Sequence, residues 1–221
     1  MKNIIIFGSG DNARMIFSEL IVNKEYKILG FIGKSEKKKI IEKFKNKNYY
    51  NLGSVNENKK ILDKACGVIG IGDNYIRSKV YKEIIKFNEN FSWETIISKS
   101  AIINENVLIG SGTVIMPNVT INFGSRIERH CLINTSTSID HDNLFKDFSS
   151  TGPGVTTAGR VLVGNFSHIG VGAVIQNHCK IGKNTVIGAN SLVNNNCFDN
   201  GIYYGSPAKK IRNRTKDDKY L

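Results

Sequence analysis

The sequence predicts a small α/β domain followed by a parallel β-helix, and three observations carry this prediction. Bulky apolar residues recur every six positions from Ile103 to Val193, without any insertion. A small residue stands two positions before most of them, and a glycine follows many of them. Near the N-terminus, a short apolar run leads into a glycine-rich turn and an amphipathic segment, as in a strand followed by a helix.

The six-residue period is the repeat of a parallel β-helix. Of the sixteen repeat positions, fourteen hold Ile, Val or Phe, and Thr151 and Thr157 fill the other two. In this fold three hexapeptides form one triangular coil, whose large residues point inward and whose faces stack on the next coil. An α-helix is excluded because its period does not keep these positions on one face. The repeat over 97–193 predicts about five coils.

The N-terminal region begins with a predicted buried strand from Lys2 to Phe7. The turn GSGDNA (8–13) follows directly, and a helix is predicted from Arg14 to Asn23. Such a turn leaves backbone N–H groups and the positive end of the helix where a phosphate group can bind. The same pattern also serves as a plain strand-to-helix turn, so the motif marks a candidate site only.

Two more strands complete a small sheet. They are predicted from Lys27 to Ile32 and from Gly67 to Ile71, and a helix from Arg77 to Phe87 follows. The second strand ends at Gly33-Lys34, where an NAD site would carry an acidic residue for the ribose. Three strands in about ninety residues form half of a dinucleotide-binding fold, so a mononucleotide or a nucleotide sugar fits better.

These elements predict two domains, a Rossmann-like nucleotide-sugar-binding domain over 1–92 and a β-helix domain over 93–221. Trp93 is expected to pack at the junction. The segment GSPAK (205–209) is predicted to cap the last coil, because an open solenoid end leaves apolar residues and backbone groups uncovered. The charged tail from Lys210 onward is predicted to be mobile.

The composition fits a soluble, cytoplasmic protein. The opening MKNIIIFGSG holds an apolar run too short for a signal peptide, and no run of eighteen apolar residues could span a membrane. The four cysteines form no CxxC pair. Cys131 and Cys179 fall on the small inward position, which predicts buried, reduced thiols rather than metal ligands.

The chain is basic, with a net charge of +12 from 31 basic and 19 acidic residues. The basic residues are not interleaved with aromatic residues, as they would be on many nucleic-acid-binding surfaces. We interpret the excess as a solvated surface that also attracts polyanionic small molecules, such as nucleotide sugars and coenzyme A. We expect no nucleic-acid partner.

Among the four histidines, His141 is the candidate general base. Acidic residues flank it on both sides, and a neighbouring carboxylate can fix the tautomer of an imidazole. His130 and His178 are predicted at solvent-facing turns, and His168 in an outward contact. A zinc site of the gamma-type carbonic anhydrases needs two histidines five residues apart, and this sequence has no such pair, so we expect no metal.

Over nearly its whole length the chain resembles the bacterial sugar O- and N-acyltransferases of the sialic acid acetyltransferase and bacillosamine-pathway type. The matching segments, in order, are IIIFGSGDNARMIFSEL, GIGDNYIRSKV, LINTSTSIDHDN, GVTTAGRVLVGNFSHIGVGAVI and YYGSPAKKI. The resemblance implies a left-handed β-helix and a homotrimer with active sites between neighbouring solenoids. It also implies acetyl-CoA as co-substrate along the groove and a nucleotide-linked amino sugar held by the N-terminal domain.

The resemblance assigns roles to residues of this sequence. It implies His141 as the catalytic base and Asp142 as the acid beside it, with Asn134 near the acceptor. The nucleotide sugar is expected at Gly8, Ser9, Gly10, Asp73 and Asn74. Coenzyme A is expected near Ser150 and Gly159, along Val171, Gly172 and Ala189, and at Pro207 and Lys209 of the terminal turn.

Two departures from the family concern specificity. Many members have a histidine nine residues after the base, where this chain has Ser150. Many also have acids after the second strand that contact the nucleotide base, where this chain has Gly33-Lys34. Uracil, thymine and guanine nucleotides are therefore all admissible.

We interpret the chain as an acetyl-CoA-dependent N-acetyltransferase for the C4 amino group of a nucleotide-linked amino-dideoxy sugar, in surface glycan biosynthesis. The alternatives are O-acetylation of a sugar of the sialic acid type, a non-catalytic nucleotide-sugar-binding solenoid, and a reductase that uses the glycine turn with NADP. The sequence does not decide between an amine and a hydroxyl acceptor, nor does it fix the length of the acyl chain.

Overall fold

The structure, a computed structural model, describes residues 1–215 and 218. The chain forms two compact units. The first comprises Met1–Gly72 and Ile76–Ile96, and the second comprises Asp73–Tyr75 and the chain from Ile97 onward.

The first unit extends beyond residue 92 because the segment around Trp93 joins its sheet. The backbone of Gly67 accepts a hydrogen bond from the backbone N–H of Glu94 at 2.9 Å. The Trp93 ring packs on Phe7 and Phe91, with ring centroids 5.6 and 4.9 Å away. Trp93 therefore belongs to the core of the first unit.

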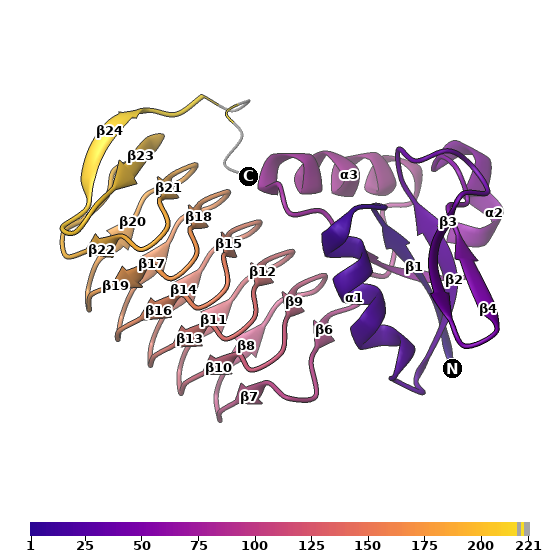
Figure 1. The fold of residues 1–221 in the computed structure, drawn as a ribbon, viewed down its shortest axis with the longest axis horizontal. Helices are drawn as coiled ribbons and strands as arrows, with labels where there is room; N and C mark the ends of the chain where they lie inside the picture. The colour runs from indigo at the N-terminus through magenta and orange to yellow at the C-terminus, as the bar shows by residue number, and fades with distance from the viewer. Residues whose placement is uncertain (216–217, 219–221) are drawn as a thin grey trace. The chain divides into compact units, whose positions relative to one another are not determined.

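The first unit contains a three-stranded parallel sheet in the order β2-β1-β5 (Figure 1). Its strands are β1 (Lys2–Phe7), β2 (Tyr26–Ile32) and β5 (Cys66–Ile69). The helices are α1 (Asp11–Ile21), η1 (Asn56–Asn58), α2 (Lys59–Leu62) and α3 (Asn74–Phe87). The three predicted strands and both predicted helices are confirmed, and β1 is buried along its last four residues because its apolar run lies at the centre of the sheet.

An antiparallel hairpin was not predicted. It consists of β3 (Ile40–Phe44) and β4 (Lys47–Tyr50). Lysines crowd this stretch and hide the alternation of apolar residues that marks a strand. Tyr49 is its one buried residue, and the Tyr49 ring packs edge-on against Phe17 of α1 at 4.8 Å.

The second unit is a parallel β-helix of two-residue strands, which follow one another around three walls (Figure 1). The β6 wall holds β6 (Ile96–Ile97), β9 (Val114–Ile115), β12 (Leu132–Ile133), β15 (Ser150–Thr151), β18 (His168–Ile169) and β21 (Val186–Ile187). The β7 wall holds β7 (Ile102–Ile103), β10 (Thr120–Ile121), β13 (Ser138–Ile139), β16 (Thr156–Thr157), β19 (Val174–Ile175) and β22 (Leu192–Val193). The β8 wall holds β8 (Leu108–Ile109), β11 (Arg126–Ile127), β14 (Leu144–Phe145), β17 (Leu162–Val163) and β20 (Lys180–Ile181).

The six-residue period places its large residues inside the prism, as predicted. Ile121, Ile139 and Ile175 of the β7 wall are fully buried in one continuous core, and Thr157 is 1 % exposed between them. Each rung pairs in parallel with the rung eighteen residues away, as Ile121 does with Ile139. Burial of apolar surface between stacked rungs therefore stabilises this unit along its whole length.

Every corner of the prism contains a residue with positive φ. These residues recur every six positions from Asn106 to Asn190, and glycine fills only some of the places. The glycines that directly follow the inward residues have a different role. A Cβ on Gly164 would lie 2.6 Å from the backbone carbon of Gly182, so that position is small because two rungs approach closely.

The solenoid has about six turns, whereas the repeat predicted about five. The reason is that β23 (Gly201–Tyr204) adds a further parallel strand beside β21, beyond the end of the repeat. The chain then turns back at residues 205–208 and β24 (Lys209–Asn213) pairs antiparallel with β23. The prediction of a mobile tail is wrong for this strand, and residues 216–217 and 219–221 of that tail lie outside the described residues.

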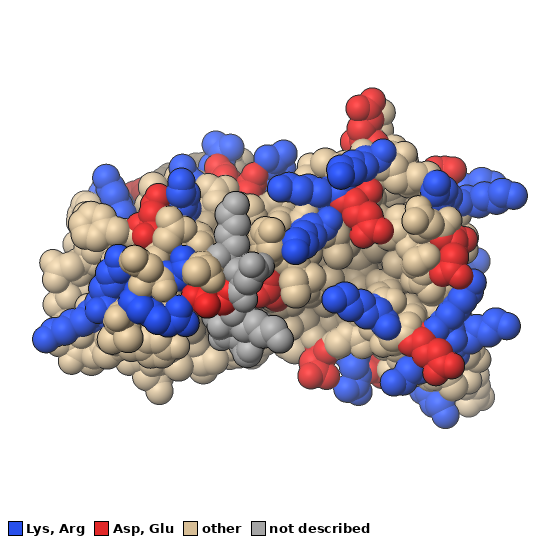
Figure 2. Space-filling view, turned by 90° about the horizontal axis from the view of Figure 1, so that it is seen from above, with Lys and Arg blue, Asp and Glu red and all other residues tan. Residues whose placement is uncertain are grey.

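The surface and the thiols match the composition. On the face shown in Figure 2, lysines and arginines are scattered among acidic and uncharged residues. All four cysteines are buried and none forms a disulfide, so the predicted burial of Cys131 and Cys179 is confirmed. Within residues 1–215 and 218, no helix combines the length and the apolar character needed to cross a bilayer.

Candidate active site

His141 lies at the corner between the β7 and β8 walls, in the turn from β13 to β14. Asp142 adopts the left-handed backbone conformation in this turn, with φ 56°. An aspartate tolerates this conformation better than most residues. The buried Asn143 side chain holds the turn, because its Nδ2 donates to the carbonyls of Asp140, His141 and Ala158 at 2.8, 3.1 and 2.9 Å. The sequence thus places the imidazole on a fixed backbone.

The imidazole forms a pair with the following carboxylate. His141 Nδ1 lies 2.9 Å from Asp142 Oδ2, and both side chains are 44 % exposed. A carboxylate that accepts from Nδ1–H leaves Nε2 as the proton-accepting nitrogen, which is the arrangement of a general base. Arg160 Nε lies 3.8 Å from the same Asp142 oxygen and balances its charge.

Gly159 lies against the ring of His141, one rung along the same corner. A Cβ at this position would lie 2.4 Å from His141 Nε2 and 2.6 Å from Cε1. The imidazole therefore fits over this rung only because residue 159 has no side chain. The residue expected near the coenzyme thioester is in direct contact with the candidate base.

A ladder of polar side chains beside this corner was missed from the sequence. Asn104 Nδ2 donates to Asn122 Oδ1 at 2.7 Å, and Asn122 Nδ2 donates to Asp140 Oδ1 at 3.2 Å. The same Asp140 oxygen accepts from the backbone N–H of His141 at 2.8 Å. The signal that could have found the ladder is the spacing of eighteen residues, which is one full coil.

Asn134 and Ser150 are not brought to His141 within one chain. Asn134 leaves β12 at the corner between the β6 and β7 walls, where its Oδ1 accepts from the backbone N–H of Thr135 at 2.8 Å. Ser150 belongs to the β6 wall, which lies opposite the corner of His141. It is 1 % exposed, and its Oγ lies 2.9 Å from His168 Nδ1.

His130 is not at the surface, so that prediction is wrong. It is 1 % exposed, and its ring stacks on Phe148 with centroids 5.1 Å apart. Phe148 in turn stacks on Phe166 at 5.5 Å, because these positions recur once per coil at one corner. His178 is exposed, as predicted.

The other residues expected to bind coenzyme A lie away from His141. Val171 and Gly172 are on the corner between the β6 and β7 walls, and Ala189 is one rung farther along it. Val171 is 52 % exposed. Pro207 lies exposed in the turn after β23, and Lys209 begins β24 with its side chain exposed. The β7 wall therefore separates Val171, Gly172 and Ala189 from the candidate base.

A separate pocket of about 580 Å³ lies within the first unit. Gly8, Ser9 and Gly10 line it from the turn between β1 and α1, and Lys34 lines it from the end of β2. Gly8 has φ 118°, and a Cβ there would lie 2.7 Å from the backbone oxygen of Gly70. The close approach of two strand ends therefore shapes this pocket, which has the volume of a small-molecule site.

The loop that carries Lys34 is held by a buried amide. Asn51 is fully buried, and its Oδ1 accepts from the backbone N–H of Gly33 at 3.1 Å. Its Nδ2 donates to the carbonyls of Gly33, Ser35 and Glu36. Ser35 Oγ lies 2.7 Å from Ser9 Oγ, which joins this loop to the glycine turn. Both walls of the pocket are thus fixed.

Asp73 and Asn74 do not line this pocket. They belong to the second unit, although their neighbours Gly72 and Ile76 line the pocket in the first. Asn74 begins α3 and is fully buried. Its Nδ2 donates to the carbonyl of Ser167 at 3.0 Å, which is a structural contact within the second unit.

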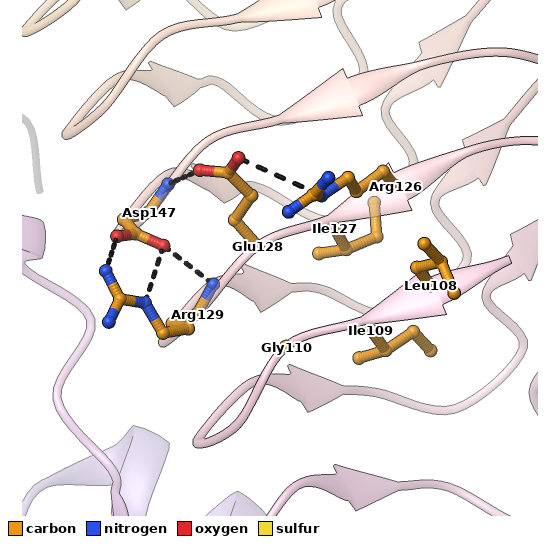
Figure 3. Close-up of a pocket in the computed structure, with 8 residues that line it drawn as sticks. All are labelled: Leu108, Ile109, Gly110, Arg126, Ile127, Glu128, Arg129 and Asp147. Carbon is orange, nitrogen blue, oxygen red and sulfur yellow. Dashed lines mark hydrogen bonds and ion pairs between the residues drawn. The ribbon is translucent and has the colours of Figure 1, made fainter.

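A further pocket of about 430 Å³ lies on the β8 wall of the solenoid (Figure 3). Arg129 and Asp147 form an ion pair at 2.6 Å, and Glu128, beside Asp147 (Figure 3), lies 4.0 Å from Arg126. The pocket contains none of the predicted site residues. Nowhere among residues 1–215 and 218 do three His, Cys, Asp or Glu side chains lie close enough together to hold a metal ion.

Comparison with known proteins adds to this geometry. The family described as the PglD N-terminal domain matches residues 3–84, and the bacterial transferase hexapeptide (six repeats) matches residues 160–195. In these two segments the chain matches the hexapeptide-repeat sugar acyltransferases. Its fold is the α/β unit and left-handed β-helix of this family, and it is an acyltransferase.

Three solved structures resemble nearly the whole chain. A variant of perosamine N-acetyltransferase from Caulobacter crescentus, in complex with CoA and GDP-perosamine, is 25% identical with a TM-score of 0.87, covering 96% of this chain and 98% of that one. The acetyltransferase domain of PglB from Neisseria gonorrhoeae FA1090, with acetyl coenzyme A, is 21% identical with a TM-score of 0.84, covering 95% and 99%. WeeI from Acinetobacter baumannii AYE is 19% identical with a TM-score of 0.79, covering 96% and 100%. No curated protein sequence matches the chain.

Proposed function

We propose that this acyltransferase transfers the acetyl group of acetyl-CoA to the amino group, at C4, of a nucleotide-linked amino-dideoxy sugar. The observation that carries the proposal is the His141–Asp142 pair, fixed at a solenoid corner with Gly159 against its ring. The nucleotide-sized pocket beside Gly8 and Lys34 supports a nucleotide-linked acceptor. The perosamine N-acetyltransferase, which binds CoA and GDP-perosamine, supports both substrates.

In the proposed mechanism the acceptor amine binds as an ammonium group, and His141 Nε2 removes one of its three protons. The nitrogen lone pair then forms the C–N bond with the thioester carbonyl carbon, and a tetrahedral intermediate collapses as the C–S bond breaks. The second proton of the nitrogen leaves with the thiolate as CoASH, and His141 returns its own proton to solvent. General-base assistance of this kind is worth about 10² to 10⁴ in rate.

We propose that a homotrimer completes the site. In one chain the candidate donor residues Val171 and Ala189 lie on a different corner from His141, with the β7 wall between them. The corner that carries Val171 and Ala189 is called the donor corner. A neighbouring copy whose donor corner lies beside this His141 would bring both substrates together. Bringing two substrates together is the main source of rate enhancement in such a reaction. Ile102 and Leu108, 58 % and 61 % exposed on the β7 and β8 walls, support burial of these walls against a neighbour.

The substrates also suggest where the enzyme acts. Acetyl-CoA and nucleotide sugars are cytoplasmic metabolites, so we place the reaction in the cytoplasm and its product in surface glycan biosynthesis. A free sugar of the sialic acid type would leave the pocket of the first unit without a role. That contrast favours N-acetylation of a nucleotide sugar over O-acetylation of a free sugar.

The decisive experiment measures turnover and binding together. A thermal-shift panel of acetyl-CoA, NADP and the UDP-, dTDP- and GDP-linked 4-amino-4,6-dideoxyhexoses identifies the ligands. His141→Ala should then lower kcat at least tenfold and leave nucleotide-sugar affinity unchanged, because a general base acts in the transition state and not on ground-state binding. An unchanged kcat rules out the role of His141. Binding of nucleotide sugar without acetyl-CoA would favour a non-catalytic solenoid, and binding of NADP alone would favour a reductase.

A further inference from the structure

The carboxylate of Asp140 is held rigidly beside the candidate base. Its Oδ1 accepts two hydrogen bonds, from the His141 backbone N–H at 2.8 Å and from Asn122 Nδ2 at 3.2 Å. Asn122 is itself fixed by Asn104 at 2.7 Å. The Asp140 backbone is fixed as well, because its carbonyl accepts from Ser125 Oγ at 2.7 Å. The Asp140 side chain therefore has one preferred orientation.

The Asp140 carboxylate differs from that of Asp142 at the same corner, because no cationic side chain among the described residues pairs with it. Within residues 1–215 and 218, Asp140 Oδ2 makes no hydrogen bond and no ion pair. Asp142, by contrast, pairs with both His141 and Arg160. Asp140 is half-buried, and a partly desolvated carboxylate oxygen gains most from a cationic hydrogen-bond donor. The corner thus presents one unbalanced negative charge next to His141.

We infer that Asp140 Oδ2 binds the amino group of the acceptor and makes the enzyme select an amine over a hydroxyl. This inference rests on the proposed function. Alkyl amines carry a positive charge near neutral pH, whereas hydroxyls do not, so only the amine forms a charge-assisted hydrogen bond with the carboxylate. The bound ammonium group then lies beside the imidazole that removes its proton. Asp140 is an acceptor-binding residue, and His141 remains the base.

Asp140→Asn tests the inference with little change of shape. The amide oxygen of asparagine can still accept from the His141 N–H and from Asn122, so the turn is retained, while the negative charge is lost. The test compares two ligands, the nucleotide-linked 4-amino-4,6-dideoxyhexose bound in the panel above and its 4-hydroxy counterpart. Their affinities are measured by calorimetry with CoA present, so that no turnover occurs.

The wild-type protein should bind the amine at least tenfold more tightly than the hydroxyl compound. Asp140→Asn should weaken amine binding about 10- to 100-fold, which is the range for hydrogen bonds to charged groups, and leave the hydroxyl compound within twofold. Asp147→Asn is the matched control, because Asp147 Oδ1 also accepts a backbone N–H, that of Arg129 at 2.9 Å, but on another corner. It should preserve the preference for the amine.

An unchanged preference in Asp140→Asn overturns the inference. If that variant does not fold, Asp140→Ser replaces it, since a serine hydroxyl can also accept from the His141 N–H. The two ideas fail differently. A wild-type protein that acetylates no nucleotide-linked amine contradicts the proposed function, whereas an active protein whose amine preference survives without Asp140 contradicts this inference alone.

Discussion

A missing side chain decides the position of the candidate base. The imidazole of His141 lies over Gly159, within 2.4 Å of where a Cβ would stand, and Asp142 fixes its other nitrogen at 2.9 Å. Both contacts come from neighbouring rungs of one corner. Orientation of the base therefore depends on the absence of a methyl group as much as on a hydrogen bond.

Gly159→Ala should displace the imidazole, because its Cβ would overlap the ring. We expect kcat to fall at least tenfold, since small misplacement of a catalytic group is costly, with nucleotide-sugar affinity unchanged. Steady-state kinetics and calorimetry measure the two quantities. Full turnover by this variant would show that the ring does not need to rest on the Gly159 rung.

At the scale of single elements, the rungs of the solenoid depend on close approach of their backbones. A Cβ on Gly164 would meet the carbonyl carbon of Gly182 and the nitrogen of Lys183, both at 2.6 Å. These are backbone atoms of the next rung and can move only if the rung moves. Gly154 is different, because a Cβ there has no neighbour within 4 Å, although its φ is +68°.

Gly164→Ala should therefore lower the free energy of unfolding by about 1 to 3 kcal/mol, the usual cost of overpacking. For a chain of this size that corresponds to a fall in Tm of about 2 to 12 °C. In the control Gly154→Ala, only the left-handed backbone conformation is unfavourable, which should lower the free energy of unfolding by about 1 to 2 kcal/mol. Destabilisation of less than about 1 kcal/mol by Gly164→Ala, seen by calorimetric melting, would contradict the steric argument.

The elements also show what a sequence can and cannot predict. The inward Ile and Val positions fix the rungs because a single period of six repeats the same physical environment. The hairpin of β3 and β4 was missed because its lysines hide the strand pattern. The stacking of His130 on Phe148 was missed because it joins side chains eighteen residues apart, whereas the six-residue period describes one corner after another.

For the whole molecule, the sequence predicted two units but not the placement of site residues between corners. His141 and Gly159 lie on one corner. Ser150 lies on the β6 wall and Val171 on another corner, because successive hexapeptides alternate among three walls. The resemblance suggested roles for these residues without this geometry. The three-walled fold places the proposed donor residues and His141 on different corners.

The trimer proposal predicts complementation between two inactive variants. His141→Ala lacks the base, and Val171→Asp should block the donor corner with a charge. Trimers assembled from a mixture of both variants should regain part of the wild-type turnover, because some sites combine an intact His141 corner with an intact donor corner. Acetyl transfer is measured before and after unfolding and joint refolding of the two chains. Absence of any recovery in mixed trimers would contradict a shared site.

The buried thiols predict a pH dependence of stability. Burial raises the pKa of Cys66 to about 11 and that of Cys197 to about 12. An unfolded cysteine ionises near pH ~8.5, so between there and the folded values the unfolded state releases protons that the folded state keeps. The contribution of these two thiols to the free energy of unfolding should therefore be constant below pH ~8 and fall from about pH 9 to 11. Urea unfolding at pH 8 and 10.5 measures the change, and equal midpoints would contradict it.

The eighteen-residue coil also sets the distances between features along the solenoid. Several stacked rungs separate His141 from the β23–β24 hairpin, and neighbouring strands are spaced about 4.8 Å apart. Deleting one complete coil between them would shorten that interval by a single step and leave every wall facing the same way, whereas deleting one hexapeptide would turn His141 toward a different side.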